Sequence, residues 1–187
     1  MRMNNGGEML GMARVLKVAE LGNAVLRSPT DPIENIQDPA IQRLIDNLLK
    51  TIKKQNGVGI AAPQVFESLQ LFIVASRPNL RYLNAPTMEP TPMINPQIIA
   101  YSDEQEKGWE GCLSVPGLRG QVIRSKEIEV TYTDRHGKQH QQVFTDFVAR
   151  IIQHEFDHIN GKLFIDRVES TLELMSDAEY HTQIVCG

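Results

Sequence analysis

Residues 147–159 read FVARIIQHEFDHI, and this stretch decides the fold as well as the chemistry. Its apolar residues recur at the spacing of one helix face, so it predicts a largely buried α-helix. His154 and His158 are four residues apart and therefore lie on the same face of that helix, with Glu155 one step around it. This is an H-E-x-x-H motif, in which two imidazoles bind one metal ion and the glutamate can reach a metal-bound water.

Two histidines do not complete a metal site, so a third ligand must come from elsewhere in the chain. The protease pattern that continues to a third histidine fails here, because Phe164 occupies the required position. We favour Cys112, which lies in WEGCLSVPG at residues 109–117, a stretch whose glycines predict a loop-like backbone with a tight turn.

Two other readings of the H-E-x-x-H helix stay open at this point. A metalloprotease would take a glutamate of the tail as its third ligand, whereas a structural metal domain would need a fourth protein ligand. The candidate ligands are Glu169, Glu173 and Glu179 for the protease, and His181 or Cys186 for the structural site.

A third segment, GVGIAAPQ at residues 57–64, predicts a backbone that another group approaches closely, because it combines two glycines with two alanines. It is not a phosphate-binding loop, since no Gly-Lys-Ser/Thr follows. Its last residue, Gln64, could donate an amide N–H to a developing oxyanion.

The remaining patterns predict an α+β fold, with antiparallel or mixed sheets around a central helix that carries the H-E-x-x-H motif. Pro96 confines the predicted strand over residues 93–101 to a sheet edge or a bulge. His136 and His140 are expected to be solvated residues of a predicted hairpin. A tail from Val168 is expected to form a last helix. The other predicted elements are a helix over residues 39–54, strands over 69–75 and 93–101, a proline-rich loop over 77–92, and a hairpin of strands 127–133 and 138–144.

Length and composition bound the class of protein. The chain has 187 residues, of which 41% are hydrophobic, as in ordinary globular proteins. We expect a loosely packed or disordered extension over residues 1–13 and a single metallohydrolase domain over residues 14–187, in which the last 20 or so residues form a helix. A net charge of −4 argues against binding nucleic acid by overall phosphate attraction, and two cysteines are too few for a disulfide-stapled secreted scaffold.

No apolar run is long enough for a membrane span, so no membrane association is expected. The first residues do not form a secretory signal, because Glu8 and the polar stretch at residues 4–7 interrupt any apolar block. The predicted compartment is the reducing cytoplasm, with an organellar origin left open.

Taken together, the three segments resemble the peptide deformylase family. The matching motifs are G-x-G-x-A-A-x-Q at residues 57–64, E-G-C-L-S at 110–114 and H-E-x-x-H at 154–158, and they occur in the family's order. The resemblance covers roughly residues 14–167. It implies a metal-dependent hydrolase that removes the formyl group from the N-terminal formylmethionine of nascent polypeptides and releases formate.

The resemblance also implies roles for individual residues. Cys112, His154 and His158 would hold one divalent metal ion, commonly Fe²⁺ in the family, with Zn²⁺ or another divalent ion able to replace it. Glu155 would act as general base and then general acid. The oxyanion would be stabilised by the side chain of Gln64 and the backbone N–H of Leu113.

The expected partners are an N-formylmethionyl peptide and, by analogy with the family, the ribosome from which nascent chains emerge. An extended peptide would pair with the backbone around Val58 and Gly59 and with the loop near Glu110. The methionine side chain would enter an apolar slot formed by Val58 and Ile151, which Arg150 borders without lining it.

Overall fold

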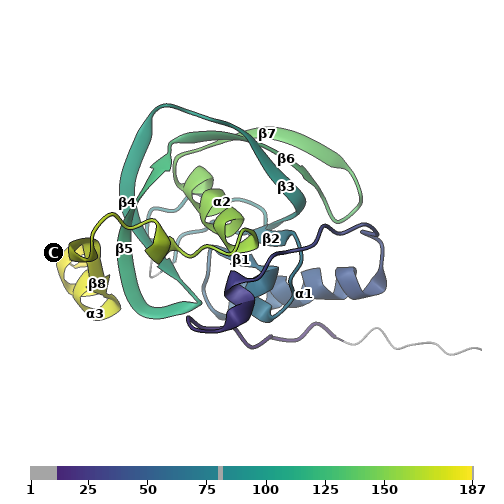
Figure 1. The fold of residues 1–187 in the computed structure, drawn as a ribbon, viewed down its shortest axis with the longest axis horizontal. Coiled ribbons are helices and arrows are strands. Elements are labelled where there is room, and N and C mark those ends of the chain that lie inside the picture. Colours follow the sequence, from purple (N-terminus) through teal and green to yellow (C-terminus); the bar gives the residue numbers. More distant parts are fainter. Residues whose placement is uncertain (1–11, 80–81, 187) are drawn as a thin grey trace, which may run out of the picture.

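Strand β2 (Leu71–Val74) is buried on both faces in the computed structural model, which describes residues 12–79 and 82–186. Successive side chains of a strand point to opposite faces of its sheet. Leu71 and Ile73 pack in one apolar cluster with helix α1 (Pro39–Lys54), and the two alternate side chains of β2 pack in a second cluster with helix α2 (Asp146–Ile159). The sheet that contains β2 therefore lies between α1 and α2 (Figure 1).

The larger sheet has five strands, all paired antiparallel, in the order β1-β2-β3-β6-β7. The predicted hairpin is confirmed as β6 and β7. Pro96 lies in β3, an inner strand whose register shifts between Ile94 and Gln97, so the bulge is the alternative that holds. The strands not yet bounded are β1 (Gly59–Ala61), β3 (Thr91–Tyr101), β6 (Glu127–Thr133) and β7 (Gln139–Thr145).

A second antiparallel sheet, with the order β4-β5-β8, consists of β4 (Gln105–Cys112), β5 (Val115–Ser125) and β8 (Leu174–Ser176). The loop predicted over residues 109–117 is wrong, because this stretch is a hairpin between β4 and β5. Of its two glycines, Gly117 adopts a positive φ of 76°, whereas Gly111 serves close packing within the sheet. A Cβ on Gly111 would lie 2.6 Å from Nη1 of Arg119, so glycine leaves the room that the arginine side chain needs.

The tail also differs from its prediction. Where a last helix was expected from Val168, the chain forms a 3₁₀ turn (Thr171–Glu173), strand β8, helix α3 (Asp177–Tyr180) and a π-helical turn (His181–Val185). Leu174 packs against the apolar cluster that contains Phe164, and this cluster holds the tail as a strand beside β5. Of the predicted extension, residues 1–11 lie outside the described residues.

Helix α1 has the predicted bounds, and the Asp38 side chain caps it by accepting a hydrogen bond from the N–H of Ala40 at 2.7 Å. The predicted α+β class is confirmed. None of the helices in the described part of the chain is long and apolar enough to span a bilayer. The remaining short helices are 3₁₀ turns at Ala24–Arg27, Ala62–Val65 and Phe164–Asp166.

Candidate active site

Helix α2 and the β4–β5 hairpin bring the candidate metal ligands together. His154 and His158 lie one turn apart on α2, with their ring centroids 5.0 Å apart, and are buried. Cys112 ends strand β4, and its Sγ lies 3.2 Å from Nε2 of His158. The ligand atoms of these three residues all lie within 4.8 Å of one another. Within the described ranges, this is the only such group of His, Cys, Asp and Glu side chains.

This donor set fits one metal ion. A thiol and two imidazoles are ligands that zinc and iron share, and three protein ligands leave a position open for water or substrate. Burial alone would lower the pKa of His154, but hydrogen bonds with Cys112 and Glu110 raise it well above its usual range. Cys112 and Glu110 therefore favour a positive charge at the His154 ring. A bound metal cation can supply that charge in place of the proton.

His158 has the opposite shift. Burial, and after it the positive charges of His154 and Arg124, lower the pKa of His158 well below its usual range. Its imidazole is therefore neutral, which is the form that binds a metal.

The alternative ligands lie elsewhere. Glu169 and Glu173 pair with Lys107, and Glu179 accepts a hydrogen bond from Gln183. The other two candidates, His181 and Cys186, contact each other at 3.4 Å in the exposed tail. None of these five residues belongs to the group around Cys112.

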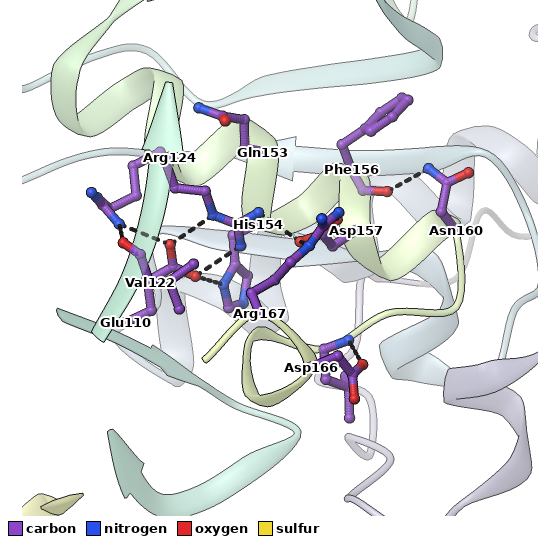
Figure 2. A network of polar contacts seen from close by, with 12 residues as sticks. Glu110, Val122, Arg124, Gln153, His154, Phe156, Asp157, Asn160, Asp166 and Arg167 are labelled. Carbon is purple, nitrogen blue, oxygen red and sulfur yellow. Dashed lines mark hydrogen bonds and ion pairs between the residues drawn. The ribbon is translucent and has the colours of Figure 1, made fainter. Parts of the chain in front are cut away.

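Glu110 orients His154 from behind (Figure 2). Its Oε2 lies 2.8 Å from Nδ1 of His154, so the other ring nitrogen is left for the metal position. Arg124 donates two hydrogen bonds to the same carboxylate, at 2.9 and 3.0 Å, and Arg150 donates one at 3.1 Å. Although burial raises the pKa of Glu110, Arg124 and His154 outweigh it and hold that pKa well below its usual range.

The same network continues along α2 to the surface. Arg124 also donates to Asp157 at 2.6 Å, and Asp157 accepts a second, two-pronged contact from Arg167 (Figure 2). Sequence reasoning missed Arg124, Asp157 and Arg167. The one available signal was Asp157, a carboxylate on a helix predicted to be largely buried, since a buried charge needs a partner.

Glu155 lies at the site as a buried acid. Its Oε2 has no hydrogen-bond partner among the described residues, and burial is the main cause that raises its pKa to about 7. Gly59 of β1 makes room for it, because a Cβ there would lie 2.2 Å from Oε1 of Glu155. The carboxyl group is thus able to take up or release a proton near neutral pH.

Gln64 is held so that its amide nitrogen faces the site. Its Oε1 accepts a hydrogen bond from the N–H of Ala61 at 2.8 Å, which fixes the orientation of the amide. Its Nε2 donates to Oγ of Ser114 at 3.1 Å and lies 3.4 Å from Sγ of Cys112.

A pocket opens onto these groups. It lies between β1 and β4, each of which is the edge strand of its sheet. Arg150, expected to border this pocket, is among its lining residues and is buried. Sequence reasoning missed three aromatic residues of the lining, Tyr82, Trp109 and Phe147. The predicted site residues that line the pocket are Val58, Gly59, Gln64, Glu110, Cys112, Leu113, Ile151, His154 and Glu155.

Comparisons with known proteins agree with this geometry. A family model described as polypeptide deformylase matches residues 15–173. The chain is 60% identical to peptide deformylase 2 of Nostoc sp. over 89% of this chain and 93% of that protein, and 43% identical to the peptide deformylase of Synechocystis sp. over 85% and 82%. The structure of a class I type b peptide deformylase from Acinetobacter baumannii, bound to Met-Ala-Ser, superposes with a TM-score of 0.82 at 45% identity, covering 84% of this chain and 100% of that one.

Proposed function

The chain belongs to the polypeptide deformylase family, and we propose that it performs the family's reaction at the pocket between β1 and β4. It is a hydrolase that removes the formyl group from the N-terminal formylmethionine of a peptide and releases formate. The observation that carries the assignment of the site is the convergence of Cys112, His154 and His158 within 4.8 Å, beside the buried carboxyl group of Glu155.

Cys112, His154 and His158 would hold one divalent metal ion. When bound, such an ion polarises a carbonyl oxygen and lowers the pKa of a water toward 7. We propose Fe²⁺ as the ion in the cell, although the same ligands suit Zn²⁺. Glu110 keeps the His154 ring in its ligating orientation throughout the reaction.

Glu155 moves the proton. As general base it accepts a proton from the attacking water while the water oxygen bonds to the formyl carbon. The carbon–nitrogen bond then breaks, and Glu155 returns the proton to the departing amine nitrogen. A carboxyl group with a pKa of about 7 suits both steps, because near neutral pH it can accept a proton and can also release one.

Gln64 and Leu113 would stabilise the negative charge that develops on the formyl oxygen. The donors are the Nε2–H of Gln64, oriented by its bond to Ala61, and the backbone N–H of Leu113 at the pocket wall. Because both donors are fixed before the substrate arrives, little reorganisation is needed when the charge appears.

The peptide would bind extended between the two edge strands. An edge strand presents unpaired backbone groups to an added strand, here around Val58 and Gly59 on one side and along β4 on the other. The methionine side chain would contact Val58 and Ile151. The Glu110 carboxylate is engaged with His154 and two arginines, so only its backbone would face the peptide.

We place the reaction on nascent chains at the ribosome, in the cytoplasm, because formylmethionine stands at the start of newly made polypeptides. Met-Ala-Ser, the ligand of the Acinetobacter baumannii relative, has the sequence that deformylation of formyl-Met-Ala-Ser would leave. The formylated tripeptide is therefore a suitable test substrate for this chain.

The test is formate release from formyl-Met-Ala-Ser by protein purified without oxygen and loaded with Fe²⁺ or Zn²⁺. We expect turnover by the parent protein and a loss of at least about 10² in kcat for Glu155→Ala, with the metal retained. His136→Ala is the matched control, since His136 is exposed in the β6–β7 turn, and it should keep metal and activity. Absence of formate with the metal-loaded parent would refute the proposal.

A further inference from the structure

The C-terminal segment, residues 174–185, lies beyond residue 173, where the match to the family model ends. Its strand β8 lies beside β5 (Figure 1). Met175 is opposite Arg119 in this pairing. Helix α3 follows directly. The segment is therefore placed to act on the side chain of Arg119.

Arg119 is a buried cation held between this segment and the loop before β3. Its side chain is 5% exposed, and its Nε donates a hydrogen bond to Oδ1 of Asp177 at 2.6 Å. Its Nη1 donates to the hydroxyl of Tyr82 at 3.1 Å, and its guanidinium carbon lies 5.0 Å from the ring centroid of Tyr180. A buried guanidinium held by several partners has one well-defined position.

That position borders the active-site pocket. The guanidinium lies against Gly111, where a Cβ would be 2.6 Å from Nη1 of Arg119. Gly111 and Tyr82 line the active-site pocket, and Trp109, which also lines it, contacts Tyr180 with ring centroids 5.5 Å apart. Three groups of the pocket wall therefore touch Arg119 or the C-terminal segment.

A second hollow borders the same wall. Arg119 and Asp177 line it, and it shares Gly111, Cys112 and Leu113 with the active-site pocket. The two hollows thus meet at the end of β4. Gly111 belongs to the part of β4 along which the peptide is proposed to pair, so the guanidinium of Arg119 packs directly against backbone that the residues after formylmethionine would contact.

We propose that Asp177 is a positioning residue for peptide binding, which acts through Arg119 on the wall shared by the two hollows. It holds Arg119 against Gly111 and Tyr82, and so sets the affinity for the residues that follow formylmethionine. It does not touch the reacting atoms. This inference rests on the proposed function, because it assumes that the formylated residue enters the active-site pocket.

The experiment compares Asp177→Ala with the parent enzyme on two substrates, formyl-Met-Ala-Ser and formylmethionine amide. Loss of one charged hydrogen bond should raise KM for the tripeptide about three- to tenfold. We expect kcat to stay within about twofold, because Glu155 and the metal ligands are untouched. KM for formylmethionine amide should not change, since this substrate lacks the following residues that would pair along β4.

Glu173→Ala is the matched control. Glu173 also belongs to the tail and also pairs with a cation of the second sheet, Lys107 of β4, but Lys107 lines neither hollow. This variant should leave KM unchanged for both substrates. Equal changes on the two substrates, no change on either, or an equal effect of Glu173→Ala would overturn the proposal.

Tyr82→Phe provides a second, independent test of the role of Arg119. It removes the hydroxyl that Arg119 holds, so KM for the tripeptide should rise, and adding Asp177→Ala should raise it by less than the product of the two single effects. Fully multiplicative effects would contradict a shared route through Arg119. Absence of formate from the parent on either substrate is a separate result, which would refute the proposed function.

Discussion

At the scale of single residues, the Glu110 carboxylate has the widest influence on the site. It joins His154, a proposed metal ligand, to two buried arginines, Arg124 and Arg150. Changing Glu110 to Gln keeps the shape but removes the charge and one acceptor, so the His154 ring loses its orientation. We expect metal affinity to fall about 10- to 100-fold, as measured by competition with a chelator of known affinity.

Glu104→Gln is the control for this change. Glu104 makes an exposed ion pair with Lys126, and removing its charge should leave metal affinity unchanged. Unaltered affinity in Glu110→Gln would show that His154 is oriented without the carboxylate.

At the scale of elements, helix α1 is a place where a substitution should change the stability of the fold without changing catalysis. Asp38 caps its N-terminus, and none of the α1 residues lines the active-site pocket. Asp38→Ala should therefore lower the free energy of unfolding by about 1 kcal/mol, as measured by urea denaturation, with kcat/KM for formyl-Met-Ala-Ser unchanged. Asp38→Ser, which can still cap, should recover most of the loss. A drop in kcat/KM would show that α1 is coupled to the site.

The elements also show which parts of the fold can be predicted from the sequence. Helix α1 and the β6–β7 hairpin were predicted because their periods, caps and turn residues are local. Strands β4 and β5 were missed, since glycines interrupt their pattern. In β4, Gly108 and Gly111 leave room for the side chains of Arg150 and Arg119. In β5, the inward-facing Arg124 also breaks the apolar alternation, because its partners are carboxylates on β4 and α2.

At the scale of the molecule, the grouping of Cys112, His154 and His158 was foreseeable from the sequence motifs, but its surroundings were not. A motif identifies the residues that carry out the chemistry, but it does not predict which residues of other segments contact them. The network of Figure 2 arises only when β5 lies beside α2, and the aromatic wall only when the loop at Tyr82 reaches Phe147, with ring centroids 4.9 Å apart. Such contacts depend on the packing of distant segments.

A metal ion held by Cys112, His154 and His158 would link the two sheets. Cys112 ends β4 of the second sheet, whereas His154 and His158 stand on α2, which packs against the first. A bound ion therefore stabilises the folded chain as a whole, by about 2.7 kcal/mol at a free concentration 100 times its Kd.

Removing the metal with a chelator should lower Tm by about 5–10 °C in calorimetry, and adding Zn²⁺ should restore it. Cys112→Ala should melt at one temperature with or without metal, because the ion loses its contact with the second sheet, whereas His136→Ala should respond as the parent does. If the metal-free and metal-loaded parent proteins melted together, the ion would not join the sheets. A full response in Cys112→Ala would place the third ligand elsewhere in the chain.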